Sequence, residues 1–135
     1  MLGARGSGEG RLTEPVGLAI DANGDIYVAD VGNRRIQRLD VLGRYLGSWP
    51  IAPSESVNGT HLVLGDDGLV YATEPARQRF VVFTKEGKMV GRWGQGGQGS
   101  GQFDRPTGFA LDGQGYLYVA DTYNHRVQKW KMADE

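Results

Sequence analysis

An arginine follows an acidic residue by five positions at three places in the chain: Asp30 and Arg35, Glu74 and Arg79, Asp121 and Arg126. A planar guanidinium binds a carboxylate or a phosphate through two parallel hydrogen bonds. The three arginines are therefore candidate binding residues for an acidic ligand. The same spacing fits an internal ion pair, which would use both charges within the protein. The sequence leaves both interpretations open.

Three further polar residues belong to the candidate ligand-binding set. Asn33 and Asn124 each precede one of these arginines by two positions, and Asn also suits tight turns because it tolerates positive φ. His61 falls on a predicted innermost strand, where two copies in a dimer would face each other. Zinc needs about four ligands, and the chain has 2 His and no Cys. We predict no metal, no cofactor and no catalytic residue.

A glycine-rich segment, Gly94–Gly99, matches the Gly-x-Gly-x-x-Gly pattern of nucleotide-binding loops. That pattern binds a pyrophosphate where a helix follows it. Here the chain leads into a predicted strand at Pro106, so nucleotide binding is not expected. We interpret this segment and the similar stretch from Gly3 to Gly10 as flexible connections between strands.

The composition limits the classes of function. The 135 residues include 15 Lys+Arg, 16 Asp+Glu and 22 Gly, with a net charge of −1. Near-neutral charge argues against a basic nucleic-acid domain or a cationic membrane binder. No apolar run approaches the roughly 20 residues that span a bilayer, and residues 1–10 lack the apolar core of a signal peptide. We expect a soluble protein without a membrane partner; the compartment stays open.

The elements that must position these residues recur along the chain. Segments 15–49, 59–93 and 106–135 align without gaps, and Gly24, Gly68 and Gly115 fall at equivalent positions, 44 and 47 residues apart. Within the first segment, short runs rich in β-branched and aromatic residues predict strands at 16–20, 25–29, 35–40 and 44–49. We predict no helix. Four antiparallel strands in a period of this length are typical of a β-propeller blade.

The recurring motifs carry a resemblance to a known family. They read Pro-x-Gly-hydrophobic-Ala-x-Asp at 15–21 and 106–112, then Tyr-Val-Ala-Asp at 27–30 and 118–121, then Asn-x-Arg-hydrophobic at 33–36 and 124–127. The chain resembles three NHL repeats, which implies a six-bladed ring. The second repeat departs from the pattern at Gly59, Gly65, Glu74 and Arg77.

The repeats predict an all-β, single-domain half-propeller over residues 1–135, with blades at about 12–49, 57–93 and 103–135. The third blade lacks most of its outer strand, and residues 1–3 of a partner would complete it in part. Each blade needs neighbours on both faces, and propellers close with about four to eight blades. A homodimer that closes a six-bladed ring meets both conditions. A natural half, an excised fragment and a designed repeat stay open.

These observations favour a non-catalytic scaffold that binds proteins, peptides or acidic ligands. The resemblance leaves two alternatives. Peptide-amidating lyases among the six-bladed relatives hold a metal and catalytic polar groups at the channel mouth, and some animal NHL proteins bind RNA. The sequence offers no His-rich inner-strand set for the first, and its net charge of −1 argues against the second.

Overall fold

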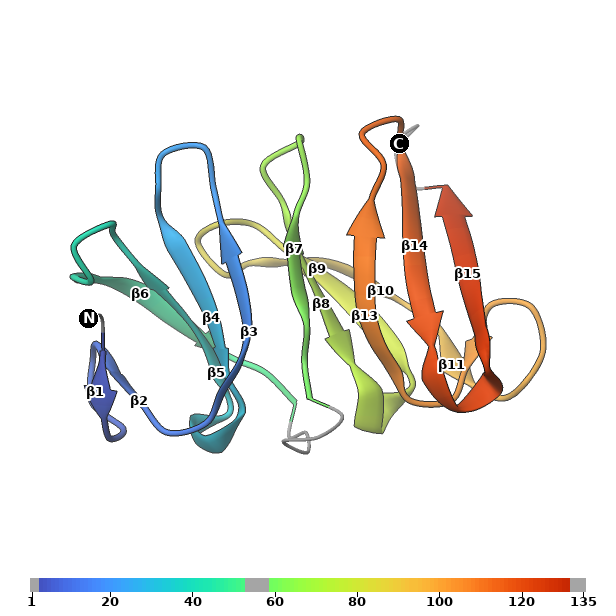
Figure 1. The fold of residues 1–135 in the computed structure, drawn as a ribbon, viewed down its shortest axis with the longest axis horizontal. Helices are drawn as coiled ribbons and strands as arrows, with labels where there is room; N and C mark the ends of the chain where they lie inside the picture. Colours follow the sequence, from blue (N-terminus) through green and yellow to red (C-terminus); the bar gives the residue numbers. More distant parts are fainter. Residues whose placement is uncertain (1–2, 53–58, 132–135) are drawn as a thin grey trace.

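The computed structural model describes residues 3–52 and 59–131, and within those residues the chain has no α-helix. Three antiparallel sheets stand side by side along the long axis of the molecule (Figure 1). This confirms the predicted all-β fold of propeller blades. Over the same residues, no helix has the length and apolar character to cross a membrane.

Each sheet runs from an inner strand to an outer strand in chain order. The first contains β3 (Pro15–Ile20), β4 (Ile26–Asp30), β5 (Arg35–Leu39) and β6 (Tyr45–Pro50). The second contains β7 (Leu62–Leu64), β8 (Val70–Glu74), β9 (Arg79–Phe83) and β10 (Met89–Trp93). The third contains β13 (Pro106–Leu111), β14 (Tyr116–Asp121) and β15 (Arg126–Lys131), and no described residue pairs with the outer edge of β15. Every strand predicted in the first blade lies within one residue of its observed ends.

An aspartate forms each turn between the first and second strands. In the first blade Asp21 accepts the Asn23 and Asp25 N–H groups and the Tyr27 hydroxyl, the last at 3.0 Å. In the second blade glycine occupies the position of Asp21, and Asp67 accepts the Tyr71 hydroxyl at 3.0 Å instead. The turn geometry therefore survives the departure of the second repeat from the family pattern.

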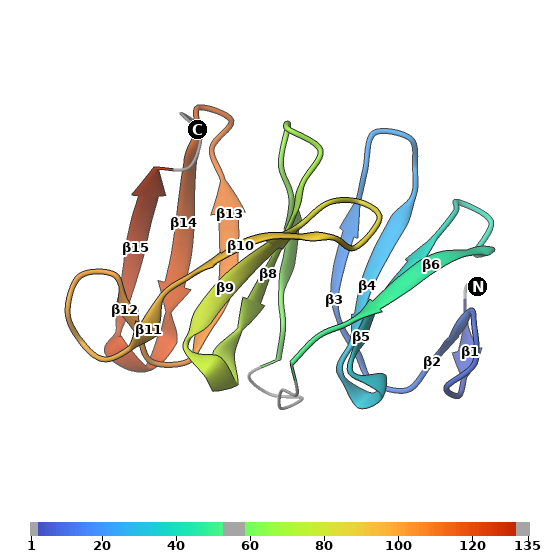
Figure 2. The same cartoon turned by 180° about the vertical axis from the view of Figure 1, so that it is seen from behind.

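Packing between blades forms two hydrophobic cores. The first lies between blades one and two and contains Tyr27, Ile36, Trp49, Val70 and Phe83 among its buried side chains. The second lies between blades two and three, where Phe80 stacks on Trp93 with ring centroids 5.5 Å apart and Phe103 stacks on Trp130 at 5.7 Å. The inner strands β3, β7 and β13 come together on one side (Figures 1 and 2).

A three-residue 3₁₀ turn joins the second and third strands of each blade: η1 (Val31–Asn33), η2 (Pro75–Arg77) and η3 (Thr122–Asn124). The residue after each turn has left-handed backbone geometry, with φ near +56° at Arg34, Gln78 and His125 (54°, 58° and 56°). All three turns lie at one end of the molecule, the lower end in Figure 1.

The two glycine-rich connections have regular structure, where we predicted flexible segments. In one, β1 (Ala4–Arg5) pairs in parallel with β2 (Arg11–Leu12); in the other, β11 (Gln95–Gly96) pairs in parallel with β12 (Gln102–Phe103). Side chains of the blade that follows each connection bind its backbone carbonyls, which explains the order. The connections reach the same end as the 3₁₀ turns.

Candidate binding face

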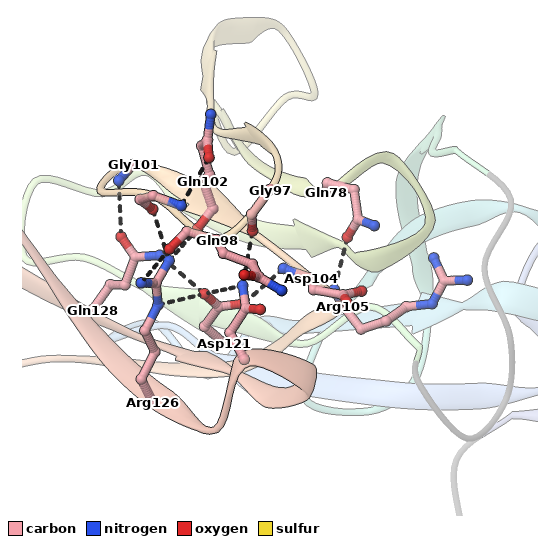
Figure 3. Close-up of polar contacts among 12 residues, drawn as sticks. Gln78, Gly97, Gln98, Gly101, Gln102, Asp104, Arg105, Asp121, Arg126 and Gln128 are labelled. Atoms are coloured by element: carbon pink, nitrogen blue, oxygen red, sulfur yellow. Dashed lines mark hydrogen bonds and ion pairs between the residues drawn. The ribbon is translucent and has the colours of Figure 1, made fainter.

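The candidate site in the third blade is built around a buried carboxylate. Asp121 ends β14, is fully buried, and accepts the Asp104 backbone N–H at 2.7 Å. Its Oδ2 also accepts hydrogen bonds from Asn124 Nδ2 at 3.0 Å, Arg126 Nε at 2.9 Å and Gln128 Nε2 at 3.1 Å (Figure 3). The carboxylate thus joins the turn, the third strand and the incoming connection.

The remaining donors of Arg126 point into the glycine-rich connection rather than to solvent. Nη1 donates to the Gln98 carbonyl, and Nη2 donates to the Gly99 and Gln102 carbonyls, all at 2.8 Å (Figure 3). Gln128 Nε2 donates to the same Gln102 carbonyl at 2.6 Å. We call the residues Asn124, Arg126 and Gln128, together with Asp121, the carbonyl cradle of the third blade.

The first blade repeats this cradle. Asp30 accepts the Thr13 and Glu14 backbone N–H groups at 2.9 and 2.7 Å. Asn33 donates to Asp30 and to the Gly6 carbonyl, and Gln37 donates to the Arg11 carbonyl. Arg35 donates to the carbonyls of Ser7, Gly8 and Arg11, and its contacts go to backbone oxygen rather than to Asp30.

The second blade keeps the ion pair without the full cradle. Arg79 Nε donates to Glu74, which is 5% exposed. Arg77 stands where the other blades have Asn33 and Asn124, and Val81 where they have Gln37 and Gln128. Its preceding connection runs partly through 53–58, outside the described residues.

The internal ion pairs expected as an alternative are confirmed for Arg79 with Glu74 and Arg126 with Asp121. Ligand binding by Arg35, Arg79, Arg126, Asn33 and Asn124 stays a prediction. The structure assigns their donors to backbone carbonyls and buried carboxylates. The acceptors of the three arginines differ: Arg35 donates to backbone carbonyls, Arg79 to the Glu74 carboxylate, and Arg126 to both kinds of acceptor.

The hydrogen bonds of the cradle control the charge state of its carboxylate. Burial by itself would raise the pKa of Asp121, since it disfavours the charged form. The donations from the Asp104 N–H, Asn124, Arg126 and Gln128 outweigh burial and hold that pKa below its usual range. Asp121 is therefore an ionised acceptor near neutral pH.

His61 lies apart from this cluster. Its side chain is exposed just before β7, and Nδ1 is 3.2 Å from the Gly59 carbonyl. Its backbone sits against the inner strand of the first blade, because a Cβ on Gly17 would come within 3.4 Å of the His61 Cα. Over residues 3–52 and 59–131, no three His, Asp or Glu side chains gather as metal ligands.

Sequence reasoning missed the two glutamines, Gln37 and Gln128, and two exposed arginines at the same end, Arg34 and Arg77. The recurrence of Asn-x-Arg-x-Gln at 33–37 and 124–128 was the signal for the glutamines. Arg34 and Arg77 make no side-chain hydrogen bond or ion pair with the described part of the chain. They are two of the cations that this face offers to solvent.

The first blade also leaves an apolar face open. Leu12, Leu18, Ile20, Ile26, Val28 and Leu39 line a hollow of about 400 Å³ on the side away from the second blade. Leu18 is 64% exposed and Ile20 is 60% exposed. At the other end of the row, Val127 of β15 is 66% exposed, whereas the equivalent Ile36 and Phe80 are fully buried.

Comparison with known proteins agrees with this geometry. Residues 12–39 and 103–130 match the family model "NHL repeat". The chain is 28% identical over 124 residues to protein brain tumor of Drosophila melanogaster, covering 88% of this chain and 12% of that protein. It is 31% identical over 147 residues to peptidylglycine alpha-amidating monooxygenase of Rattus norvegicus, covering 93% of this chain and 14% of that protein. The chain thus spans a small fraction of these relatives.

Solved structures resemble it in fold. Virginiamycin B lyase from Staphylococcus aureus superposes with a TM-score of 0.62 at 17% identity, covering 91% of this chain and 43% of that one. Regucalcin from Agrobacterium tumefaciens superposes with a TM-score of 0.61 at 14% identity, covering 90% and 46%. Taken with the recurring sheets and cradles, these matches identify a β-propeller fold that carries NHL repeats at residues 12–39 and 103–130.

Proposed function

We propose that this chain is a non-catalytic scaffold whose two open faces pair with those of a second copy, closing a six-bladed ring that binds peptides or acidic ligands. One observation supports the assembly most directly. The first and third blades each have one open face. The residue positions on these two faces are the same positions that pack in the two interfaces between neighbouring blades of the chain. The chain therefore contains two examples of the contact that the proposal requires.

The equivalence holds position by position on the face of the first blade. Leu18, Ile20 and Ile26 correspond to Phe109, Leu111 and Leu117 of the third blade. Leu117 belongs to the hydrophobic core that contains Phe80 of the second blade, and Phe109 and Leu111 pack against that core. In the proposed ring, Leu18 and Ile20 pack on the third blade of the partner in the same way.

Self-association gives the first test. Burial of one large aliphatic side chain contributes roughly 1.5–3 kcal/mol, so replacing two of them with charges should weaken the dimer at least about 100-fold. We expect a mass near twice the 14.7 kDa of one chain in sedimentation equilibrium. The Leu18→Asp/Ile20→Asp variant should sediment as a folded monomer at the same concentration.

The matched control lies on the outer strand of the central blade, where neither open face is involved. Met89 and Val90 are 45% and 54% exposed on β10. The Met89→Asp/Val90→Asp variant should keep the wild-type mass. A wild-type monomer at micromolar concentration would refute the ring, and so would equal weakening by both variants.

The binding role is proposed for the end that carries the 3₁₀ turns. The guanidiniums of Arg35 and Arg126 are engaged with carbonyls, whereas the exposed Arg34 and Arg77 next to them can attract an acidic ligand. Arg34→Gln/Arg77→Gln should weaken binding of a fluorescent poly-glutamate peptide at least about threefold at low salt. Arg92→Gln, an exposed change on β10, is the control. Equal affinity of the two variants would contradict this assignment.

A further inference from the structure

A cavity lies between the second and third blades, apart from the cradles and the exposed arginines. It has a volume of about 550 Å³ and is lined by both blades, around the turns that follow β7 and β13. These turns lie at the end of the molecule opposite the 3₁₀ turns, the upper end in Figure 1. The volume falls within the range of small-ligand sites, about 300–1,000 Å³, and gives room for one large side chain.

The lining of this cavity combines apolar side chains with carboxylates. Leu64 and Leu111 contribute aliphatic surface from the two inner strands. Asp66, Asp67 and Asp112 contribute the carboxylates, and no lysine, arginine or histidine is among the described residues that line the cavity. A ligand that complements this lining therefore carries a positive charge on an apolar stem.

Hydrogen bonds within the turns fix two of these carboxylates. Asp112 accepts the Gln114 N–H at 2.7 Å, which is the main reason that the pKa of Asp112 lies below the usual range of a carboxyl group. Asp67 accepts the Leu69 N–H at 3.0 Å. A carboxylate has about four acceptor positions, so both groups can accept further donors from a ligand.

Asp66 is the third carboxylate, and its side chain is exposed and makes no hydrogen bond or ion pair with residues 3–52 and 59–131. It reaches the turn of the third blade, because a Cβ placed on Gly113 would lie 3.9 Å from Asp66 Oδ2. Lys129 acts electrostatically on Asp112, but its Nζ is held 4.1 Å from the centre of the Tyr116 ring and it does not line the cavity. Carboxylates of two blades thus border one cavity.

The gap between the first and second blades shows which group such a lining binds. There Arg38 lies over the ring of Tyr27, with Cζ 5.5 Å from the ring centre, and donates to Asp25 at 2.7 Å. In the second blade the tyrosine recurs as Tyr71, which lines the cavity, but Val82 stands where the first blade has Arg38. The second gap therefore combines a tyrosine with carboxylates and has no guanidinium among its described lining residues.

We propose that this cavity binds the arginine side chain of a separate polypeptide, with its guanidinium between Asp66 and Asp112 and its methylene groups against Leu64 and Leu111. A guanidinium suits the lining because its planar donors can pair with more than one carboxylate and it is more weakly hydrated than an ammonium. Its methylene stem packs on apolar surface while the charge stays near water. The inference does not depend on ring closure, because both blades belong to one chain.

The test titrates the isotope-labelled 135-residue chain with the capped peptide acetyl-Gly-Arg-Gly-amide and records amide chemical shifts by NMR. We expect saturable shifts centred on Gly65, Asp66 and Gly113. The same peptide with citrulline in place of arginine keeps the shape and loses the charge, and it should bind at least about tenfold more weakly. Equal affinity for the two peptides, or shifts centred on the 3₁₀ turns, would overturn the proposal.

The protein side is tested by substitution of Asp66, whose side chain holds no other part of the fold in place. Asp66→Asn should weaken binding of the arginine peptide at least about threefold, and Asp66→Lys should abolish it. Glu9→Gln is the matched control, because it removes one exposed carboxylate in the first glycine-rich connection, away from the cavity, and it should bind as well as the wild type. Equal effects of Asp66→Asn and Glu9→Gln would refute the assignment.

Discussion

At the scale of single residues, Asp121 and Asp30 organise the structure through the hydrogen bonds that they accept. Each is fully buried and binds backbone N–H groups of the incoming connection. A buried carboxylate is costly unless donors surround it. The asparagine, arginine and glutamine that recur after each of them supply those donors or bind the adjoining carbonyls, which makes the cluster a unit.

Removing the carboxylate of the third cradle should destabilise the protein. Asp121→Ala leaves Asn124, Arg126 and Gln128 without a common acceptor, and we expect the free energy of unfolding to fall by about 2–4 kcal/mol. Urea denaturation followed by circular dichroism measures the change. Glu86→Gln is the control, because Glu86 is 79% exposed and 3.9 Å from Arg38; its effect should stay within about 0.5 kcal/mol. Equal effects of the two changes would contradict the role of the cradle.

The stability should also depend on pH through this carboxylate. The pKa of Asp121 is lower in the folded protein than its usual value, so its stabilisation is present above about pH 4 and is lost as the pH falls through the folded pKa. The same direction holds for Asp21 and Asp112. Between pH 5 and 3, the urea midpoint of Asp121→Asn should therefore fall less steeply than that of the wild type. Parallel pH profiles would show that Asp121 is not a source of the dependence.

At the scale of elements, the strands follow from the sequence and the connections do not. Repeated positions such as Gly24, Gly68 and Gly115 align the three blades, and the short runs rich in β-branched and aromatic residues give the strand ends within one residue in the first blade. The glycine-rich connections are ordered by side-chain hydrogen bonds to their backbone carbonyls. Every residue has such a carbonyl, so the residue pattern does not reveal these bonds. In the second blade, Asp67 accepts the tyrosine hydroxyl in place of an aspartate at position 65, and this replacement also depends on turn geometry.

The left-handed residues after the 3₁₀ turns allow a prediction at this scale. Arg34 has φ of 54° and an exposed side chain, and left-handed geometry costs a non-glycine residue about 1–2 kcal/mol. Arg34→Gly should raise the free energy of unfolding by about 0.5–1 kcal/mol, after part of the gain is offset by the greater freedom of glycine in the unfolded chain.

Gln78 provides the matched comparison, with φ of 58°. Its Oε1 accepts the Arg105 backbone N–H at 2.7 Å. Gln78→Gly relieves the same backbone strain but leaves this N–H unpaired, so we expect no gain in stability and a loss of up to about 1 kcal/mol. Thermal denaturation of the two variants side by side measures the difference. A larger gain for Gln78→Gly would contradict the explanation.

At the scale of the whole molecule, the three blades use one packing scheme, and two faces of that scheme have no partner among the described residues. Leu18 and Ile20 on one side and Val127 on the other have exposures of 64%, 60% and 66%. The family resemblance predicts blades, and the sequence predicts the strand ranges of the first blade. Neither can supply the exposure of these residues, because exposure depends on which neighbours are present.

Thermal stability should accordingly depend on protein concentration. If folded chains bind each other and unfolded chains do not, mass action raises Tm as concentration rises. Scanning calorimetry from about 5 to 500 µM should show this rise for the wild type, and Leu18→Asp/Ile20→Asp should abolish it. A wild-type Tm that stays constant over this range would count against assembly through the open faces.

The carbonyl cradles also define which piece of this protein is interchangeable. The connection at 94–103 is bound by Asn124, Arg126 and Gln128, which belong to the blade after it. A chimera that joins blades from two related chains between Trp93 and Gly94 therefore keeps the side chains of Asn124, Arg126 and Gln128 with their native carbonyl acceptors. A junction at Pro106 instead places Arg126 opposite a foreign connection, and grafts made there should fold less well.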